Sequence, residues 1–211
     1  MIFRDRIDAG KLLVAKLKKY KKDTGLIMAV PRGGLPVAYV VAIELGFPID
    51  LILTKKIGHP VYKEYAIGSV SLTDHFVLPY ENVTQEYINE EVQRIRTRLK
   101  EMYTRYMDDK EPENAAGKTM IVIDDVIATG NTLLGTIHML RQSKPAKIVI
   151  GVPVASQNAV MELSTEVDEV VAVLIPDKFS GVGGYYDDFE EVSDEEVMYY
   201  LDKLRKLSRV G

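Results

Sequence analysis

The chain has 211 residues, 46% of them hydrophobic, which is enough to bury one substantial core. We therefore expect a single domain over residues 1–211. Its 27 basic and 31 acidic residues give a formal net charge of -4, so no overall positive field attracts nucleic acid or an anionic membrane. The absence of cysteine excludes disulfides, thiolate nucleophiles and cysteine metal sites. With no secretory hydrophobic stretch at its start and no apolar run that could cross a bilayer, we predict a soluble, cytoplasmic protein.

Two helices and two strands are predicted in the first quarter of the chain. The strands are short, continuous apolar runs, which are typical of strands buried on both faces. Asp8 is the expected N-cap of the first helix, and Gly46 closes the second. The elements are predicted at residues 8–20 (helix), 26–30 (strand), 36–45 (helix) and 51–54 (strand). This order, with a glycine turn after the first strand, describes a βαβ unit, so we expect a parallel sheet.

The middle of the chain departs from this alternation. Residues 55–80 are predicted as a loop followed by a strand near 66–72. A long, charge-dense helix follows over 84–107, and its apolar residues form one narrow stripe. We interpret residues of about 74–117 as an insertion, whose helix is either a lid or a dimer arm.

The alternation of strands and helices returns in the second half. Ser156 is the expected N-cap of one helix, and Ser193 with Glu196 has the spacing of a capping box. The elements are predicted at residues 120–123 (strand), 132–141 (helix), 147–154 (strand), 156–164 (helix), 169–175 (strand) and 193–207 (helix).

The segment between the strand 120–123 and the helix 132–141 has the residues of a ligand site. Asp124 and Asp125 follow the strand directly, and a turn of small residues then opens the helix. The N–H groups of such a turn, the helix N-terminus and threonine hydroxyls together bind a phosphate, and a glycine permits close backbone approach. Carboxylates beside a bound phosphate accept hydrogen bonds from sugar hydroxyls, so the pattern indicates a phosphorylated pentose. The turn residues are Ala128, Thr129, Gly130, Asn131 and Thr132.

This stretch resembles the diphosphoribosyl-binding motif of type I phosphoribosyltransferases, in which hydrophobic residues precede two acids, three variable positions and Thr-Gly-x-Thr. Four more segments, at 3–6, 31–36, 55–58 and 182–189, are similar to a subgroup of these enzymes whose acceptor is undefined. The similarity covers most of the chain. It implies an α/β fold with a mainly parallel central sheet flanked by helices, an inserted helical lid and a small hood. The hood is expected at about 176–190, followed by the C-terminal helix.

The resemblance implies an activity: Mg²⁺-dependent transfer of the phosphoribosyl group from phosphoribosyl diphosphate to a nitrogenous, nucleobase-like acceptor, with release of diphosphate. Asp124 and Asp125 would be the catalytic residues, holding the ribose hydroxyls through an oxocarbenium-like state. Substrate oxygens would hold most of the Mg²⁺ coordination, with no direct protein ligand assigned. Arg32 and Gly33 would contact the diphosphate, in a turn for which the family often uses an unusual peptide geometry. Relatives of this fold commonly pair, so we expect a homodimer.

Further substrate contacts are expected from lysines and from the hood. Lys55 or Lys56 would add positive charge near the diphosphate, and Phe179 and Tyr185 are candidate stacking surfaces for a flat acceptor. The segment 176–179 is similar to the one with which hypoxanthine-guanine phosphoribosyltransferases hold a 6-oxopurine. Those enzymes carry an acid at the position of Ala128, so the alanine argues against purine salvage but not against transfer.

Each of these features also has a plainer structural explanation. Two aspartates after a strand are, by themselves, more often part of a solvated turn, and the aromatic residues of the hood are equally suited to packing. Lysines are common at strand ends, and an arginine before two glycines is a frequent turn residue. Three histidines lack the mutual spacing of metal ligands, so we interpret them as structural or exposed: His59, His75 and His138.

Two functions of different classes stay open at this point. The first is the transferase, which predicts acceptor-dependent release of diphosphate. The second is a non-catalytic protein of the same fold that senses phosphoribosyl diphosphate or a nucleotide and signals through the inserted helix. A receiver-like phospho-acceptor domain is disfavoured because the acids occur late in the chain, beside a phosphate-binding turn. The sequence contains neither a dinucleotide-binding G-x-G-x-x-G motif nor a P-loop.

Overall fold

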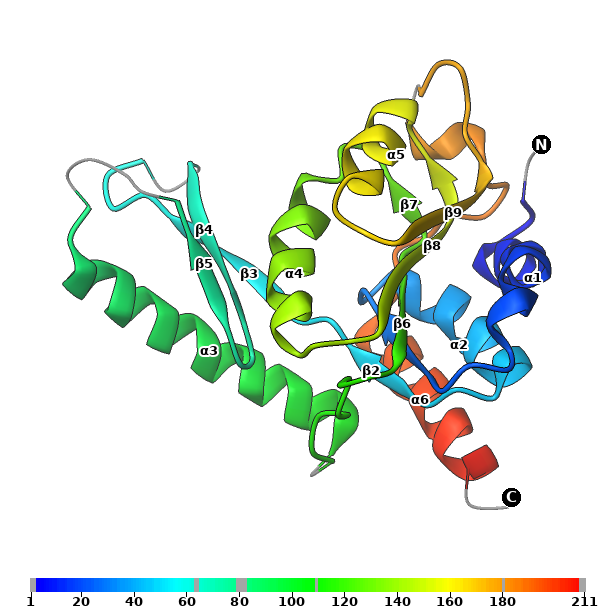
Figure 1. Cartoon of the computed structure of the whole chain (residues 1–211), viewed down its shortest axis with the longest axis horizontal. Coiled ribbons are helices and arrows are strands. Elements are labelled where there is room, and N and C mark those ends of the chain that lie inside the picture. Colours follow the sequence, from blue (N-terminus) through cyan, green and yellow to red (C-terminus); the bar gives the residue numbers. More distant parts are fainter. Residues whose placement is uncertain (1–2, 63–64, 79–82, 109, 180, 209–211) are drawn as a thin grey trace.

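A parallel sheet forms the centre of the computed structural model, which describes residues 3–62, 65–78, 83–108, 110–179 and 181–208 (Figure 1). All strand pairs of this sheet are parallel, in the order β2-β1-β6-β8-β9. The short strand β7 pairs with the later part of β8, in the same register as β6. The parallel sheet predicted from the sequence is therefore confirmed. The strands are β1 (Gly25–Ala29), β2 (Ile49–Leu51), β6 (Thr119–Ile123), β7 (Val126–Ile127), β8 (Lys147–Ala155) and β9 (Glu169–Leu174).

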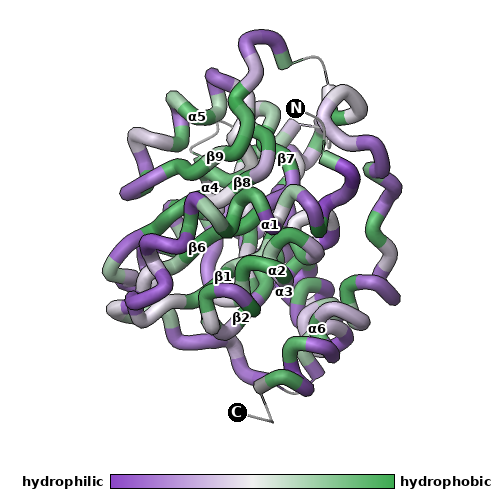
Figure 2. The backbone as a smooth tube through the Cα atoms, turned by 90° about the vertical axis from the view of Figure 1, so that its right-hand side faces the viewer, coloured by the Kyte–Doolittle hydropathy of each residue, from purple (hydrophilic) through white to green (hydrophobic). Residues whose placement is uncertain are grey.

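Helices cover both faces of the sheet, and this burial explains the continuous apolar runs of the strands. Every residue of β1 and β6 is buried, and Figure 2 shows these strands as hydrophobic segments at the centre of the molecule. One face packs against α1 and α2, with α6 packed against α2 and α3 (Gln85–Met107), whereas α4 and α5 cover the other face. The helices are α1 (Arg6–Leu17), α2 (Gly34–Leu45), α4 (Asn131–Gln142), α5 (Gln157–Ser164) and α6 (Asp194–Ser208), with short 3-10 turns at Lys18–Tyr20 and Val182–Gly184.

The helix ends show which capping predictions hold. Asp5, and not Asp8, caps α1: the Asp8 N–H donates to Asp5 Oδ1 at 2.7 Å. The prediction was wrong because either acid can precede the helix, and only the backbone conformation decides between them. The box at Ser193 and Glu196 is confirmed, since each backbone N–H donates to the other side chain, at 2.9 and 3.1 Å. Gly46 ends α2 in the left-handed conformation, with φ of 73°, as predicted.

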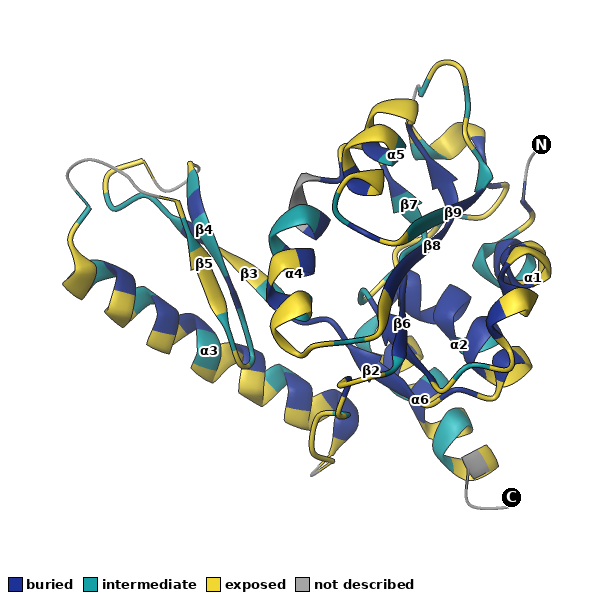
Figure 3. Cartoon of the chain, in the orientation of Figure 1, coloured by how far each residue is buried: buried dark blue, intermediate teal, exposed yellow. Residues whose placement is uncertain are grey.

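Beside the parallel sheet, an arm projects from the body of the molecule (Figure 1). It combines an antiparallel sheet with the long helix α3, whose one buried stripe is visible in Figure 3. Thr84 caps α3, so the predicted helix is confirmed. The strand predicted near 66–72 is confirmed as β4, but the segments predicted as loop around it also contain the strands β3 and β5. The arm elements are β3 (Thr54–Gly58), β4 (Ala66–Ser71), β5 (His75–Val77) and α3 (Gln85–Met107).

The apolar run predicted as one strand at 51–54 is the point where the chain changes sheets. Strand β2 ends at Leu51 in the parallel sheet, and β3 begins at Thr54 in the arm. Lys55 and Lys56 then lie exposed on β3, which gives this strand the polar composition of a loop. The arm sheet therefore starts well before residue 74, where we placed the insertion. In the described part of the chain, no helix combines the length and hydropathy needed to span a membrane.

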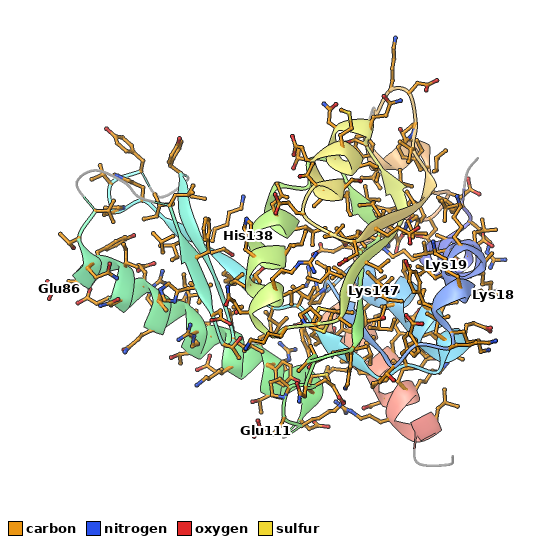
Figure 4. All side chains as sticks on the ribbon, in the orientation of Figure 1. Lys18, Lys19, Glu86, Glu111, His138 and Lys147 are labelled. Carbon is orange, nitrogen blue, oxygen red and sulfur yellow. The ribbon has the colours of Figure 1, made fainter. Side chains whose placement is uncertain are left out.

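The arm is anchored to the body through a buried carboxylate. Asp50, only 3% exposed, accepts hydrogen bonds from the Tyr103 hydroxyl at 2.9 Å and from the N–H groups of Leu51 and Glu113, both at 2.7 Å. Burial raises the pKa of Asp50, and the three donors oppose that rise. Asp50 thereby joins β2, α3 and the connection that returns to β6. A second contact joins the arm to the body: the ring of Phe76 on β5 packs against His138 of α4, with ring centroids 5.8 Å apart (Figure 4).

Candidate active site

The acid pair, Asp124 and Asp125, lies between β6 and β7. It follows β6 directly, as predicted, but pairing with β8 resumes immediately afterwards at Val126. The backbone N–H of Asp125 donates to Asp124 Oδ1 at 2.9 Å. Burial raises the pKa of Asp124, and the neighbouring charge of Asp125 raises it further. The two carboxyl groups therefore have different environments although they are adjacent in sequence.

Asp125 is held by groups that come from both ends of the chain. Arg6, in the first turn of α1, donates from Nε to Asp125 Oδ2 at 2.8 Å, and these side chains are only 11% and 13% exposed. The hydroxyl of Tyr186 donates to the backbone carbonyl of Asp125 at 2.9 Å. The Arg6 guanidinium also lies 3.8 Å from the ring centroid of Phe189. The N-terminal segment and the hood thus meet at the acid pair.

The turn at 128–132 has the geometry of an anion-binding helix start. Gly130 adopts the left-handed conformation, with φ of 72°, immediately before α4, and its carbonyl accepts from Leu133 N–H at 2.9 Å. The N–H groups of a first helical turn lack partners within their helix and attract anions. Ala128 and Thr129 are exposed beside them. The side chains of Asn131 and Thr132 lie outside the described part of the structure.

Ser156 connects this turn to helix α5. Its hydroxyl donates to the Ala128 carbonyl at 2.6 Å and accepts from the Ala159 N–H at 3.1 Å, which makes it the predicted N-cap. Ser156 is buried, so its bond to Ala159 is shielded from water, whereas its bond to the exposed Ala128 is partly buried.

We expect Ser156→Ala to lower the free energy of unfolding by about 1–2 kcal/mol, since the variant loses a helix cap and the hydrogen bond to the Ala128 carbonyl. Urea unfolding measures this change. Thr165→Ala is the matched control: Thr165 is exposed at the other end of α5, where its hydroxyl donates to the Glu162 carbonyl. A loss for Ser156→Ala no larger than that of the control would contradict the dual role of this hydroxyl.

The loop between β1 and α2 packs directly against the acid pair. The Pro31–Arg32 peptide bond is cis, so the unusual peptide geometry implied by the resemblance is present. A Cβ atom on Gly33 would lie 2.1 Å from Asp125 Oδ2, so only glycine fits while that carboxylate keeps its position. Arg32 forms ion pairs with Glu191 and, at 3.5 Å, with Asp194. The guanidinium of Arg32 is thus paired with acids at the start of α6.

A cavity of about 550 Å³ lies where these segments meet. Basic residues, the acid pair and apolar residues near the hood all line it. The acid pair, Arg32 and Gly33 of the predicted site line it, together with Ala128. The other lining residues are Arg6, Pro31, Val126, Val182, Phe189, Glu191 and Val192.

Six described residues that were predicted to contact substrate do not line this cavity: Thr129 and Gly130, from the turn whose Ala128 does line it, and Lys55, Lys56, Phe179 and Tyr185. Lys55 and Lys56 lie exposed on the arm sheet. Tyr185 is buried, and its hydroxyl donates to the backbone carbonyl of Lys178 at 3.1 Å. Phe179 packs beside it, with ring centroids 5.7 Å apart. These two aromatic residues therefore belong to the packing of the hood in this structure, and their contact with substrate stays a prediction.

Comparison with known proteins matches residues 5–190 to the family model of the phosphoribosyl transferase domain. The chain belongs to this family. The match includes the acid pair, the 128–132 turn, the loop at Arg32 and the hood. The fold predicted from the resemblance is therefore confirmed for this phosphoribosyl transferase domain.

Relatives of known name or structure agree with this assignment. The Mycobacterium tuberculosis protein named "Putative phosphoribosyl transferase Rv0571c" is 30% identical over 97% of this chain, which spans about half (47%) of that protein's length. The crystal structure of TT1426 from Thermus thermophilus is 36% identical, with a TM-score of 0.84, and covers 96% of this chain and 99% of that one. A hypothetical protein from Neisseria gonorrhoeae, solved with bound ppGpp, shares the fold alone, at 12% identity and a TM-score of 0.51, with 99% and 97% of the two chains covered.

Sequence reasoning assigned no role to Arg6 or Phe189 in this phosphoribosyl transferase domain, although both line the cavity. Their segments, 3–6 and 182–189, had been singled out only as similar to the subgroup. That similarity was the available signal. Nothing in the spacing of these residues indicated that they would meet at Asp125.

Proposed function

We propose that this domain transfers the phosphoribosyl group of phosphoribosyl diphosphate to a flat nitrogenous acceptor and releases diphosphate. The observation that supports this most is the convergence of the acid pair, the Arg32 loop and Ala128, the first residue of the 128–132 turn, around one cavity. The turn would bind the 5-phosphate of the donor, the acid pair its ribose hydroxyls, and the arginine its diphosphate. We also propose that residues 1–211 act as one unit, with the arm as a lid, in a homodimer.

The 128–132 turn is the proposed site of the 5-phosphate. Backbone N–H groups at the start of α4 point along the helix axis and carry the positive end of its dipole, which favours a dianion. Gly130 allows the phosphate to approach the backbone closely because no Cβ atom intervenes. Thr129, Asn131 and Thr132 are the proposed side-chain donors.

Asp124 and Asp125 are the proposed catalytic residues. In the transfer, the bond from C1 to the diphosphate oxygen breaks and the electron pair leaves with the diphosphate. A lone pair of the acceptor nitrogen then forms the new C1–N bond, and the acceptor releases its proton. Positive charge develops on the ribose, and carboxylates that accept hydrogen bonds from its 2- and 3-hydroxyls stabilise that charge.

Mg²⁺ is the proposed cofactor, and the donor set of the cavity suits it. The hard carboxylate oxygens of the acid pair and of Glu191 are of the kind that Mg²⁺ prefers. The described residues contain no cluster of three or more metal-ligating side chains, so substrate oxygens and water would complete its coordination. When bound, the ion neutralises charge on the departing diphosphate.

Arg32 and the Gly33 backbone are the proposed diphosphate contacts, and Lys55 or Lys56 would add charge only if the arm approached the cavity. The guanidinium of Arg32 has Glu191 and Asp194 as partners, and the diphosphate would replace one of them. A diphosphate carries more negative charge than either carboxylate and presents several acceptor oxygens to the arginine.

The acceptor is proposed to bind against the hood side of the cavity. Phe189, Val182 and Val192 supply apolar surface there, and Ala128 leaves room where an acid would stand. A flat heterocycle fits such a wall by stacking and apolar contact. Phe179 and Tyr185 remain proposed acceptor residues that would need to turn out of the hood packing.

The proposed function predicts that phosphoribosyl diphosphate with Mg²⁺ raises the thermal unfolding midpoint. A ligand at 100 times its Kd stabilises the folded state by about 2.7 kcal/mol. Ribose 5-phosphate should give a smaller shift because it lacks the diphosphate. Assays of diphosphate release over a panel of nucleobases and other nitrogen heterocycles then test transfer. Absence of any thermal shift contradicts the proposed donor site, and binding without release from any acceptor contradicts the transferase in favour of a sensor.

A further inference from the structure

Arg6 is the basic group nearest to the acid pair, and its setting differs from that of a surface arginine. Its side chain is only 11% exposed, and it makes three separate contacts with neighbouring segments. Nε donates to Asp125 Oδ2 at 2.8 Å, Nη1 donates to the backbone carbonyl of Glu190 at 2.8 Å, and the guanidinium lies over the ring of Phe189 at 3.8 Å. A buried guanidinium is tolerated only with such partners, so these contacts define one orientation of the side chain.

The backbone before Arg6 is equally well anchored. Phe3 pairs with Tyr186 in an isolated parallel bridge: the Phe3 N–H donates to the Tyr185 carbonyl at 2.7 Å, and the Phe3 carbonyl accepts from the Asp187 N–H at 2.8 Å. Asp5 caps α1 at its first turn, which contains Arg6. The N-terminal segment therefore packs against the hood, and these hydrogen bonds fix the backbone position from which the Arg6 side chain extends.

Asp125 is confined on its other sides by the main chain. Its own N–H donates to Asp124, its carbonyl accepts from the Tyr186 hydroxyl, and its carboxylate lies against the backbone of Gly33. Its Oδ2 accepts from Arg6, which does not bond its Oδ1, and the neighbouring Asp124 carboxyl interacts with the Asp125 side chain. Arg6 thus anchors one oxygen and does not occupy the other.

We propose that Arg6 is a positioning residue of the transfer site: its ion pair with Asp125 holds one carboxylate oxygen in place and leaves the other for a ribose hydroxyl of the donor. The inference rests on the proposed function. A free aspartate would lose rotamer freedom on binding the sugar, whereas an aspartate already held by Arg6 loses little. Arg6 acts through Asp125 and does not itself need to touch the donor.

The test is a double-mutant cycle on donor affinity. The Kd of phosphoribosyl diphosphate with Mg²⁺ is measured by titration calorimetry for the wild type, Arg6→Gln, Asp125→Ala and the double variant, well below their unfolding temperatures. We expect Arg6→Gln to weaken binding about tenfold or more when Asp125 is present, because a charge-assisted contact loses its orientation. In the Asp125→Ala background, the same substitution should change the Kd less than about twofold, since nothing remains to be positioned.

Two further variants separate positioning from folding. Arg6→Lys keeps the charge but reaches only one acceptor at a time, so it should restore part of the affinity that Arg6→Gln loses. Arg4→Gln is the matched control on the same segment, because the Arg4 side chain is 69% exposed and pairs with its neighbour Asp5. Its Kd should equal that of the wild type. An equal loss for Arg6→Gln in both backgrounds, or no loss in either, overturns the inference.

A crystal structure of Arg6→Gln without ligand provides a second, independent measurement. The inference predicts that the Asp125 carboxylate turns away from its position beside Gly33 or becomes poorly ordered. An unchanged, well-ordered carboxylate would overturn it. If the wild type does not bind the donor at all, the proposed function fails by itself, and the position of Asp125 in this variant still decides whether Arg6 holds the carboxylate.

Discussion

Replacing Asp124 and Asp125 together by asparagine should lower kcat/KM for diphosphate release by about a thousandfold, while the protein stays folded. Neutral amides at these positions cannot stabilise the positive charge that develops on the ribose. The change is measured with the acceptor that gives the fastest release in the wild type. The single variants show how the two acids divide the effect, since their environments differ.

Retention of the fold in this variant has a structural reason. Asparagine has the volume of aspartate and keeps one oxygen, which can still accept from Arg6 at position 125. At position 124 the variant removes a carboxyl whose pKa is raised by burial and by the neighbouring charge, and so removes a repulsion. The thermal unfolding midpoint and the circular dichroism spectrum serve as controls. Turnover equal to that of the wild type would remove these carboxylates from the mechanism.

Asp50→Ala should lower the free energy of unfolding by about 3 kcal/mol, the largest loss that we expect from a single residue outside the cavity. The variant leaves the Tyr103 hydroxyl and the N–H groups of Leu51 and Glu113 without their acceptor. Since these groups lie at the junction of the arm and the body, the amides of α3 near Tyr103 should also exchange faster with solvent. Urea unfolding and hydrogen exchange measure the two effects.

Two controls accompany this variant. Asp50→Asn keeps the side-chain volume and one acceptor oxygen, so its loss should be intermediate. Asp177→Ala removes an exposed carboxylate of the hood and should change the free energy of unfolding by less than about 0.5 kcal/mol. If Asp50→Ala were no less stable than Asp177→Ala, the anchoring role of Asp50 would be wrong.

The predictions that depend on residues close together in the sequence were more accurate than those that depend on residues brought together by folding. The strands of the central sheet were recognisable because burial on both faces requires continuous apolar runs such as that of β6. Helix α3 was recognisable from a stripe of apolar residues with helical period. Where two local solutions were equally good, as for Asp5 and Asp8 before α1, the choice was wrong.

Of the arm sheet, β4 was predicted near 66–72, but β3 and β5 were missed, and β3 was missed for a related reason. A strand with one solvent-facing side alternates polar and apolar residues, and β3 places adjacent lysines at Lys55 and Lys56. Its pairing partner, β4, lies beyond an intervening loop, so the polar run resembled a connection. The burial of Asp50 could not be predicted either. An aspartate is expected to be exposed, and its buried hydrogen-bond partners, Tyr103 and Glu113, are distant in the sequence.

The sequence alone determined the central sheet, the long helix and the segment of acids and small residues that carries the family resemblance, because propensity, periodicity and motif spacing are properties of neighbouring residues. Only the tertiary structure decided which other side chains join that segment. Arg6 and Asp125 are 119 residues apart, and Phe189 follows in yet another segment. Their meeting depends on the packing of α1 and the hood against the same edge of the sheet, and pairing over such distances leaves no local pattern in the chain.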